Sequence, residues 1–408
     1  MKFHWTRAMC VAAVTAVLPL AGAGAATAQS PYNAKAIFFG AKYHLTGPDD
    51  IAIVGPHIFV GFQNGVGSQG EPSTTGVTNS TLVEMDVHGS VEHMVNIRGK
   101  IDGLGSDAAN NRVIVTVNED GNSRLSTVDV HGRLVKYTYS PAVLPHHGGT
   151  DAVSVFDGKI YLSASCGGCQ NAASAGTAPP AHSPAVYEVT LNGTTATLTS
   201  TAINVDSPAV TTNPGSSAQA TPLKITDADS NTVVPSSAPR FGGDFMLDSQ
   251  GDKLAIFASS MAPSAPLKVL DLKTAIDDTT FATQSSGVLV VTDSTANTVE
   301  VVTGPFHAGE AFSAVTPCND NAAPATCPAP GWPANYLAAL NLSNGSLTPL
   351  NNTGATAWAK GLAFMPSSSS NSSQSAGVTF LEVGGGIVLV LILLTGGALL
   401  VRSRRQAA

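Results

Sequence analysis

The chain of 408 residues is predicted to form an all-β, six-bladed β-propeller, preceded by a cleaved signal peptide and followed by one transmembrane helix. Three observations predict this: a strand motif repeated at blade spacing, 40 Gly and 25 Pro with only 12% charged residues, and an apolar segment at each end. Such a composition favours short strands joined by turns over long surface helices. Seven blades are the alternative, because the stretch 201–240 is long enough to hide one.

The first apolar segment has the features of a secretory signal. Lys2 and Arg7 precede the apolar run Ala8–Ala21, and small residues end at Ala26-Thr27-Ala28. This order of basic, apolar and small residues predicts cleavage before Gln29. The run is too short for a stable transmembrane span.

The second apolar segment predicts a membrane anchor. Val383–Val401 is free of charges and is followed by Arg402, Arg404 and Arg405. Its length as a helix matches a hydrocarbon core of about 30 Å, and the basic cluster places the C-terminus in the cytoplasm, with the ectodomain outside the cell membrane in a single-pass type I arrangement. The alternative of a bacterial sorting signal lacks an LPxTG-like motif or a Pro-Glu-Pro motif. The predicted segments are a signal peptide (1–28), a propeller ectodomain (29–366), a Ser-rich tether (367–377), a transmembrane helix (378–401) and a basic tail (402–408).

The charge of the exported part excludes one class of partner. Five of the 20 basic residues and one of the 28 acidic residues lie outside 29–376, so this part has 15 basic and 27 acidic residues and a net charge of −12. A nucleic-acid-binding protein needs clustered Lys and Arg, so nucleic acid is excluded as a partner. Cations are the favoured partners.

Four cysteines remain after signal removal and form two close pairs, Cys166 with Cys169 and Cys318 with Cys327. In an exported protein such pairs predict two local disulfides. A zinc site of four thiolates is the alternative, although the second pair has eight intervening residues rather than the usual two to four.

The clearest repeat is a duplication. Leu82–Gly89 and Leu125–Gly132 share Asp-Val-His-Gly at an offset of 43 residues, within the range of propeller blades. Each copy predicts a strand, a turn at the Gly and a second strand. Looser copies occur at 185–193, 267–273, 298–304 and 337–345. The six copies predict six blades.

A second kind of hairpin, in which an acidic residue leads an apolar strand, lies upstream of most copies. It begins at Asp50, Asp102, Asp151 and Asp244. Nearly continuous apolar strands indicate burial on both faces, as for the inner strands of packed blades. Ala34–Phe39 is predicted as a lone outer strand and Lys360–Pro366 as a lone inner strand, and together they could close the ring.

Over roughly 34–366, the spacing of the repeats and the order of the hairpins resemble those of six-bladed propellers of the NHL and SMP-30/gluconolactonase type. There is no Trp-Asp pair typical of WD40 repeats and no repeated Gly-Gly typical of kelch repeats. The Asn-Gly-Leu and Trp-Ser motif of the lactonases is not matched cleanly. The resemblance is therefore one of architecture, and it implies a metal at the mouth only if it extends to function.

Loops on one face of the predicted ring carry the polar residues, which suggests a binding face. Oxygen ligands of this kind are those that calcium or another divalent metal prefers. The alternative is that each Asp accepts backbone N–H bonds at a strand start. The candidate metal ligands are Asp102, Asn118, Glu119, Asp151 and Asp244, with a separate, weaker candidate at Asp227, Asp229 and Asn231.

Two functions follow for this face. One is a cell-surface recognition module for a protein, glycan or small molecule, displayed on the Ser-rich tether. The other is a metal-dependent lactonase- or esterase-like hydrolase, in which the metal polarises an ester carbonyl. His146, His147 and Asp151 are its candidate catalytic residues.

Overall fold

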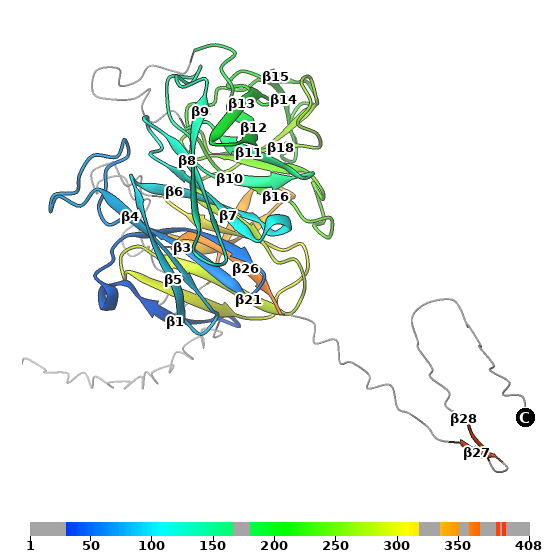
Figure 1. The fold of residues 1–408 in the computed structure, drawn as a ribbon. Coiled ribbons are helices and arrows are strands. Elements are labelled where there is room, and N and C mark those ends of the chain that lie inside the picture. Colours follow the sequence, from blue (N-terminus) through cyan, green and yellow to red (C-terminus); the bar gives the residue numbers. More distant parts are fainter. Residues whose placement is uncertain are drawn as a thin grey trace, which may run out of the picture.

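The computed structural model describes residues 30–165, 180–317, 335–350, 359–367, 381–383 and 386–388. The only helices in these ranges are two 3-10 turns, η1 (Gly40–Tyr43) and η2 (Ala108–Asn110), and the remaining elements are strands (Figure 1). Antiparallel sheets are arranged around one axis as a β-propeller, which confirms the predicted class. Six inner strands form its ring, so the described part has six blades rather than seven.

Each blade is described from its innermost strand outward. Blade 1 contains β2 (Pro48–Val54), β3 (His57–Phe62), β4 (Asn79–Met85) and β5 (Val91–Arg98). Blade 2 contains β6 (Ile101–Asp107), β7 (Arg112–Val117), β8 (Arg124–Asp129) and β9 (Leu134–Ser140). Blade 3 contains β10 (Val153–Phe156), β11 (Lys159–Ser163), β12 (Val186–Asn192) and β13 (Thr195–Ser200).

The other three blades follow the same order. Blade 4 contains β16 (Ala228–Val233), β17 (Phe245–Ser249), β18 (Leu254–Ala258) and β19 (Leu267–Asp271), with β14 (Pro208–Thr211) and β15 (Thr221–Pro222) added at its outer edge. Blade 5 contains β20 (Ile276–Phe281), β23 (Ala311–Val315), β24 (Tyr336–Asn341) and β25 (Ser346–Pro349). Blade 6 contains β26 (Ala359–Pro366), β21 (Gly287–Asp293), β22 (Thr298–Thr303) and β1 (Asn33–Phe39).

The ring closes through blade 6, where the two ends of the propeller meet. The first strand, β1, pairs with β22 on the outside, and the last, β26, pairs with β21 on the inside. Figure 1 shows blue β1 and orange β26 close to yellow β21. Ala34–Phe39 and Lys360–Pro366 therefore take the outer and inner places predicted for them.

The connection between blades 5 and 6 departs from the predicted order. After β20 starts blade 5, the chain builds β21 and β22 of blade 6, returns for β23, β24 and β25, and only then adds β26. The chain therefore crosses between these two blades three times. Counting repeats along the chain could not reveal this order, because the sequence pattern of each strand is unchanged and only its neighbour in the sheet differs.

The core is divided among the blade interfaces. Six apolar clusters each join two neighbouring blades, and together they go once round the ring. Within β3, Ile58 packs toward blade 6 while the next residue, Phe59, packs toward blade 2. Successive side chains of a strand point to opposite faces, so burial on both faces produces the continuous apolar run.

The duplicated motif takes the same place in two successive blades. Leu82–Gly89 forms β4 and its turn, and Leu125–Gly132 forms β8 and its turn, so each copy is the third strand of its blade. In both turns the Asp accepts backbone N–H groups two and four residues later, and the Gly has a positive φ. Asp-Val-His-Gly is therefore a structural turn.

Blade 4 is shifted relative to its prediction. The hairpin led by Asp244 is its second and third strands, and its inner strand is β16. β16 has the sequence Ala-Asp-Ser-Asn-Thr-Val, which lacks the apolar run of the other inner strands. Asp229 and Asn231 of the separate metal candidate therefore belong to a strand rather than to a loop, and Asp227 directly precedes that strand.

The predicted terminal segments are only partly described. The signal peptide, the four cysteines of the predicted disulfides and most of the tether lie outside the described residues. Within the predicted transmembrane helix, the structure instead has two paired strands, β27 (Leu381–Val383) and β28 (Gly386–Val388), so the helix prediction is wrong for these six residues, whose Val and Ile favour strands. None of the helices in the described ranges has the length and apolarity to span a bilayer.

Candidate functional site

The inner strands bring one charged residue each to the same end of the ring, which we call the mouth. In five blades this residue is the second of the inner strand, and in blade 3 it lies two positions before β10. The ring residues, in blade order, are Asp49, Asp102, Asp151, Asp229, Asp277 and Lys360. Five carboxylates and one ammonium group thus meet around the axis.

A β-bulge recurs at the start of five inner strands. In β6, for example, Ile101 and Leu104 pair with Val117 and Val115, so three steps on one strand match two on the other. The same shift occurs in β2, β16, β20 and β26. Bulges at the rim of a sheet redirect side chains, which turns the ring residues toward the axis.

Hydroxyl groups on the second strands hold the bulges in place. Thr116 Oγ1 accepts the Gly103 N–H at 2.8 Å and donates to the Asp151 carbonyl oxygen at 2.5 Å. Thr292 makes the matching bonds, with the Gly361 N–H at 2.8 Å and the Asp49 carbonyl oxygen at 2.6 Å. Each Thr therefore connects its own bulge to the main chain of the next blade.

Two further acidic residues of the inner strands are structural. Asp50 Oδ2 accepts the Leu104 N–H at 2.5 Å, and Asp278 Oδ2 accepts the Leu362 N–H at 2.6 Å. Each carboxylate thereby ties its inner strand to that of the next blade. The alternative that some Asp residues accept backbone N–H bonds holds for these two.

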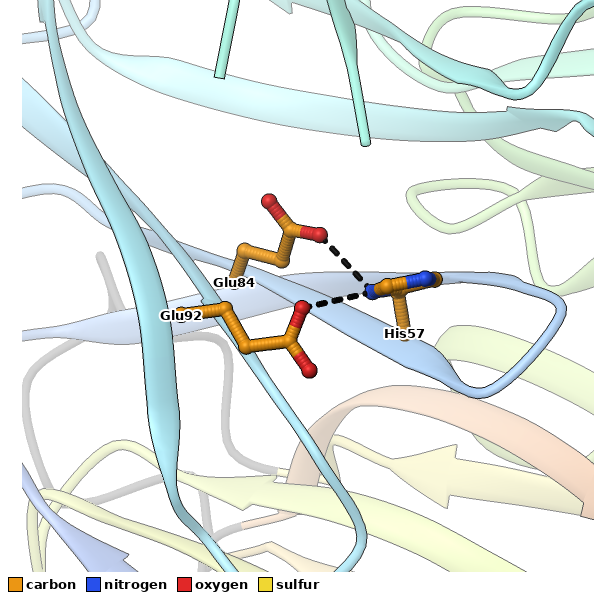
Figure 2. Close-up of side chains that lie close together, drawn as sticks. All are labelled: His57, Glu84 and Glu92. Atoms are coloured by element: carbon orange, nitrogen blue, oxygen red, sulfur yellow. Dashed lines mark hydrogen bonds and ion pairs between the residues drawn. The ribbon is translucent and has the colours of Figure 1, made fainter. Parts of the chain in front are cut away.

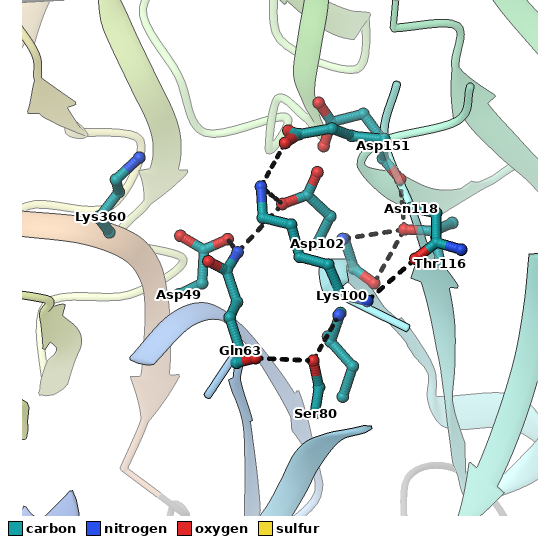
Figure 3. A network of polar contacts seen from close by, with 12 residues as sticks. Asp49, Gln63, Ser80, Lys100, Asp102, Thr116, Asn118, Asp151 and Lys360 are labelled. Atoms are coloured by element: carbon teal, nitrogen blue, oxygen red, sulfur yellow. Dashed lines mark hydrogen bonds and ion pairs between the residues drawn. The ribbon is translucent and has the colours of Figure 1, made fainter. Parts of the chain in front are cut away.

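The densest group of charges lies between blades 1, 2 and 3. Asp102, Glu119 and Asp151 each offer a carboxylate oxygen, and these oxygens all lie within 4.8 Å of one another. The Lys100 ammonium lies 3.1 Å from Asp102 Oδ1 and also forms an ion pair with Glu119. In Figure 3, Gln63 donates to Asp49 and Asp102, while Lys360 stands apart on the other side of the cavity.

Burial changes the protonation of this group. It raises the pKa of Asp49 to about 6 and that of Glu119 to about 8, in both cases mainly by desolvation. It also raises the pKa of Asp151 and of Asp229 well above the usual range. Repulsion from Asp102 and Glu119 raises the pKa of Asp151 further, and repulsion from Asp151 raises that of Asp229. Burial and like charge both disfavour the ionised form, and Glu119, with a pKa of about 8, is therefore mostly protonated at pH 7.

The ring residues line one cavity along the propeller axis, with a volume of about 1500 Å³. Three lysines line it, Lys100, Lys253 and Lys360. The carboxylates that line it are Asp49, Asp50, Asp102, Glu119, Asp120, Asp151, Asp227, Asp229, Asp277 and Asp278. Acidic residues therefore predominate over basic residues in the lining by ten to three.

The donor set fits a hard divalent cation in part. Oxygens of three carboxylates within 4.8 Å of one another can reach a common ion at the 2.3–2.6 Å typical of calcium. Asp102 Oδ2 is buried and, among the described residues, accepts no hydrogen bond from an amide, hydroxyl or ammonium group. Lys100 already neutralises part of the charge, so a metal at this position would compete with its ammonium group.

The structure separates the predicted ligands. Asp102, Glu119 and Asp151 lie together, whereas Asn118 is buried, accepts the Lys100 N–H and donates to the Asn122 carbonyl oxygen. Asp244 does not line the cavity, because it precedes the second strand of blade 4, and it lies 3.8 Å from Lys268. The separate candidate of Asp227, Asp229 and Asn231 joins the main cavity.

The histidine prediction is corrected. His146 is 1% exposed, and its ring nitrogens lie 2.8 Å from the Tyr187 hydroxyl and 2.7 Å from the Gly149 carbonyl oxygen. Burial lowers the pKa of His146. His147 forms a turn with φ 63°. Neither lines the cavity, and no other histidine of the described part does, so a base there would be a carboxylate.

Several cavity residues were missed in the sequence. Lys100, Lys360, Asp277 and Asp278 line the cavity but were not predicted as site residues. The signal that could have identified Asp277 was its place directly after Ile276, at the start of a strand, as Asp102 follows Ile101. That comparison requires knowing that β20 is an inner strand, which its Asp-Asp-Thr-Thr sequence does not suggest.

No protein-family model matches this chain, and no curated protein sequence matches it. Similar solved structures include a gluconolactonase from Xanthomonas campestris, with 15% identity over 69% of this chain and 93% of that one and a TM-score of 0.37.

Two structures of β-propeller domains are similar as well. The WD40 domain of Doa1 has 10% identity over 79% of this chain and 88% of that one, with a TM-score of 0.34. The Swd1 domain of Myceliophteria thermophila has 9% identity over 78% and 88%, with a TM-score of 0.38. At these levels the likeness stops at the β-propeller architecture, which the six blades of this chain display by themselves.

Proposed function

We propose that this chain is a ligand-binding β-propeller whose recognition site is the axial cavity, and that its ligands are cationic. The observation that carries the proposal is the lining of the cavity, with ten carboxylates and three lysines around one volume. A concave site lined by one sign of charge concentrates ligands of the opposite sign. The volume exceeds that needed for a single ion, so an amine-bearing small molecule is accommodated as well as a metal.

Binding is expected to release protons. Glu119, whose pKa is raised to about 8, holds a proton at pH 7 when the cavity is free, whereas Asp49 and Asp227, whose pKa is raised to about 6, hold theirs only below about pH 6. A cation beside them favours the ionised form and displaces those protons. Affinity should therefore rise with pH across the neutral range.

Titration calorimetry of the purified full chain tests this, with Ca²⁺ and spermidine as separate probes at pH 7 in two buffers of different ionisation enthalpy. We expect binding of at least one probe, with proton release shown by a buffer-dependent enthalpy. Glu119→Gln should weaken binding about tenfold, a change of about 1.4 kcal/mol.

Glu188→Gln is the matched control, because Glu188 pairs with the exposed Lys159 on blade 3 and does not line the cavity. It should bind the probes as the parent chain does. Absence of binding by the parent chain, or equal affinity in Glu119→Gln, would contradict the proposal.

Metal-dependent hydrolysis is the second candidate function, and the grouping of Asp102, Glu119 and Asp151 favours it. A divalent ion bound there would polarise an ester or lactone carbonyl. A carboxylate of this group would then have to activate the water, because no histidine in the described part lines the cavity.

A panel of sugar lactones and aryl esters, assayed with Ca²⁺, Mn²⁺ and Zn²⁺, separates the two functions. Hydrolysis that needs the metal and is lost in Asp151→Asn would support an enzyme. Cation binding without turnover on the whole panel would leave the binding module as the function. Asp151→Asn keeps the size of the side chain, and its urea unfolding midpoint reports whether it folds.

We further propose that the propeller is displayed outside the cell, with the acidic cavity open to external ligands. The basic and apolar N-terminal segment, the Ser-rich segment and the apolar C-terminal segment with its three arginines support this. Labelling of intact cells with a membrane-impermeant amine reagent checks it. Labelling seen only after lysis would contradict external display.

A further inference from the structure

A second group of metal-ligating side chains lies in blade 1, apart from the cavity. It consists of His57 at the start of β3, Glu84 on β4, and Glu92 and His93 on β5. Figure 2 shows His57, Glu84 and Glu92 close together. His57 follows the β2–β3 turn, at the end of the blade opposite the mouth. None of the four residues lines the axial cavity.

Strand register brings these residues to one face. Glu84 pairs with Phe59 on one side and with His93 on the other, and His57 is two residues from Phe59. A bulge in β5 leaves Glu92 without a partner between Val91 and His93. A bulge breaks the alternation of a strand, so Glu92 and His93 reach the same face.

Hydrogen bonds within this group do not satisfy all of its carboxylate oxygens. His57 Nδ1 lies 2.8 Å from Glu84 Oε1 and 2.9 Å from Glu92 Oε2. One ring nitrogen presents one proton or one lone pair, so it cannot donate to both oxygens. Glu84 is only 2% exposed, and its Oε1 is buried without a hydrogen bond of good geometry.

We propose that His57, Glu84 and Glu92 form a binding site for a divalent transition metal ion, with Zn²⁺ as the reference ion, and that His93 positions Glu84. Ligand atoms of the first three residues all lie within 4.8 Å of one another. An imidazole nitrogen with two carboxylate oxygens is a donor set that Zn²⁺ accepts, with a fourth place for water. Two carboxylates and one divalent ion make a neutral group, which suits the burial of Glu84.

The geometry needs only a small adjustment. Tetrahedral zinc with bonds of about 2.0–2.2 Å keeps its ligand atoms about 3.4 Å apart. The present distances of 2.8 and 2.9 Å must therefore widen by about half an ångström. Glu92 is 38% exposed and His57 22% exposed, so both can shift and an ion can enter from solvent.

His93 would not bind the metal itself but would form a hydrogen bond with the metal ligand Glu84. Its Nδ1 lies 2.8 Å from Glu84 Oε2, the oxygen that does not face His57. Donation from His93 fixes the rotation of the Glu84 carboxylate, as outer partners do at metal sites. The β8–β9 turn of blade 2 packs against His93, because a Cβ at Gly132 would lie 3.1 Å from its ring. The metal would thus join three strands of blade 1 next to the interface with blade 2.

Visible spectroscopy of the full chain with Co²⁺ and competition with Zn²⁺ test this site. After treatment with EDTA, the parent chain should bind one Co²⁺ with the d–d bands of a tetrahedral site, and Zn²⁺ should displace it. His57→Asn and Glu92→Gln should each weaken binding at least about 100-fold, and His93→Asn about tenfold. Both ligand variants change partly exposed side chains, so they are chosen over Glu84→Gln, which changes a buried one.

The matched control is His182→Asn, because His182 also has a carboxylate oxygen 2.9 Å from its Nδ1, that of Asp206, but is 86% exposed. This variant and Glu119→Gln should retain the Co²⁺ bands. Absence of tetrahedral bands in the parent chain, or unchanged bands in His57→Asn and Glu92→Gln, would overturn the site. Loss of the bands in Glu119→Gln alone would assign the ion to the cavity instead.

Discussion

Replacing Gly361 with alanine should strongly destabilise the propeller, because the added methyl group has no room between blades 6 and 1. A Cβ at this position would overlap the Asp49 carbonyl oxygen and lie 2.7 Å from Asp50 Cα, and both belong to the main chain of blade 1. The Gly361 N–H also bonds to Thr292, which holds the same carbonyl oxygen. Neither side can move without opening the closure between β26 and β2, so a loss on the order of 3 kcal/mol is expected.

Urea unfolding followed by intrinsic fluorescence measures this loss. Gly103→Ala should behave alike, because its Cβ would lie 2.6 Å from Ala152 Cα at the junction of blades 2 and 3. Gly158→Ala is the control, since it has φ 73° but nothing within 4 Å of the added Cβ, and it should cost only about 1 kcal/mol. Equal midpoints for Gly361→Ala and Gly158→Ala would show that the inner strands are not packed as closely as described.

The second large effect is a loss of stability between pH 5 and pH 8 in the absence of divalent cations. Burial raises the pKa of Asp49 to about 6 and that of Glu119 to about 8, whereas an unfolded chain has carboxyl pKa values near 4. In this window the folded state binds more protons, so the contribution is complete below about pH 4 and is lost as the pH rises through 6 and 8. A shift of two pKa units at one group corresponds to about 3 kcal/mol.

Thermal unfolding of the full chain from pH 5 to pH 8, in EDTA and in Ca²⁺, checks this. Calcium should raise the melting temperature most at pH 8, where the carboxylates are ionised and repel one another. Glu119→Gln should flatten the pH dependence, because an amide does not titrate. A metal-free melting temperature that rises from pH 5 to pH 8 would contradict the argument.

The fold was predictable where the pattern was local. The duplicated Asp-Val-His-Gly marks the third strand of two blades, and the strand patterns at 34–39 and 360–366 were sufficient to predict the outer and inner strands of the closing blade. Burial of a strand on both faces produces a continuous apolar run such as Ile58–Phe62, and such a run can be recognised directly in the sequence.

Prediction of the site failed where the pattern was polar. The inner strands of blades 4 and 5 have the sequences Ala-Asp-Ser-Asn-Thr-Val and Ile-Asp-Asp-Thr-Thr-Phe, because they line the polar cavity on one side. They resemble turns or calcium loops when taken alone. For this reason the sequence predicted Asp244 with the main ligands and Asp229 only in a separate candidate, and it did not predict Asp277.

The sequence by itself determined the class of fold, the acidic character of the propeller and three residues of its densest carboxylate group, because each depends on composition or on spacing along the chain. Only the tertiary structure decided the ring of six charges, the exchange of strands between blades 5 and 6, and the meeting of His57 with Glu84 and Glu92. These depend on which strands become neighbours. That choice is made by packing at the blade interfaces between segments far apart in the chain, and no local pattern carries it.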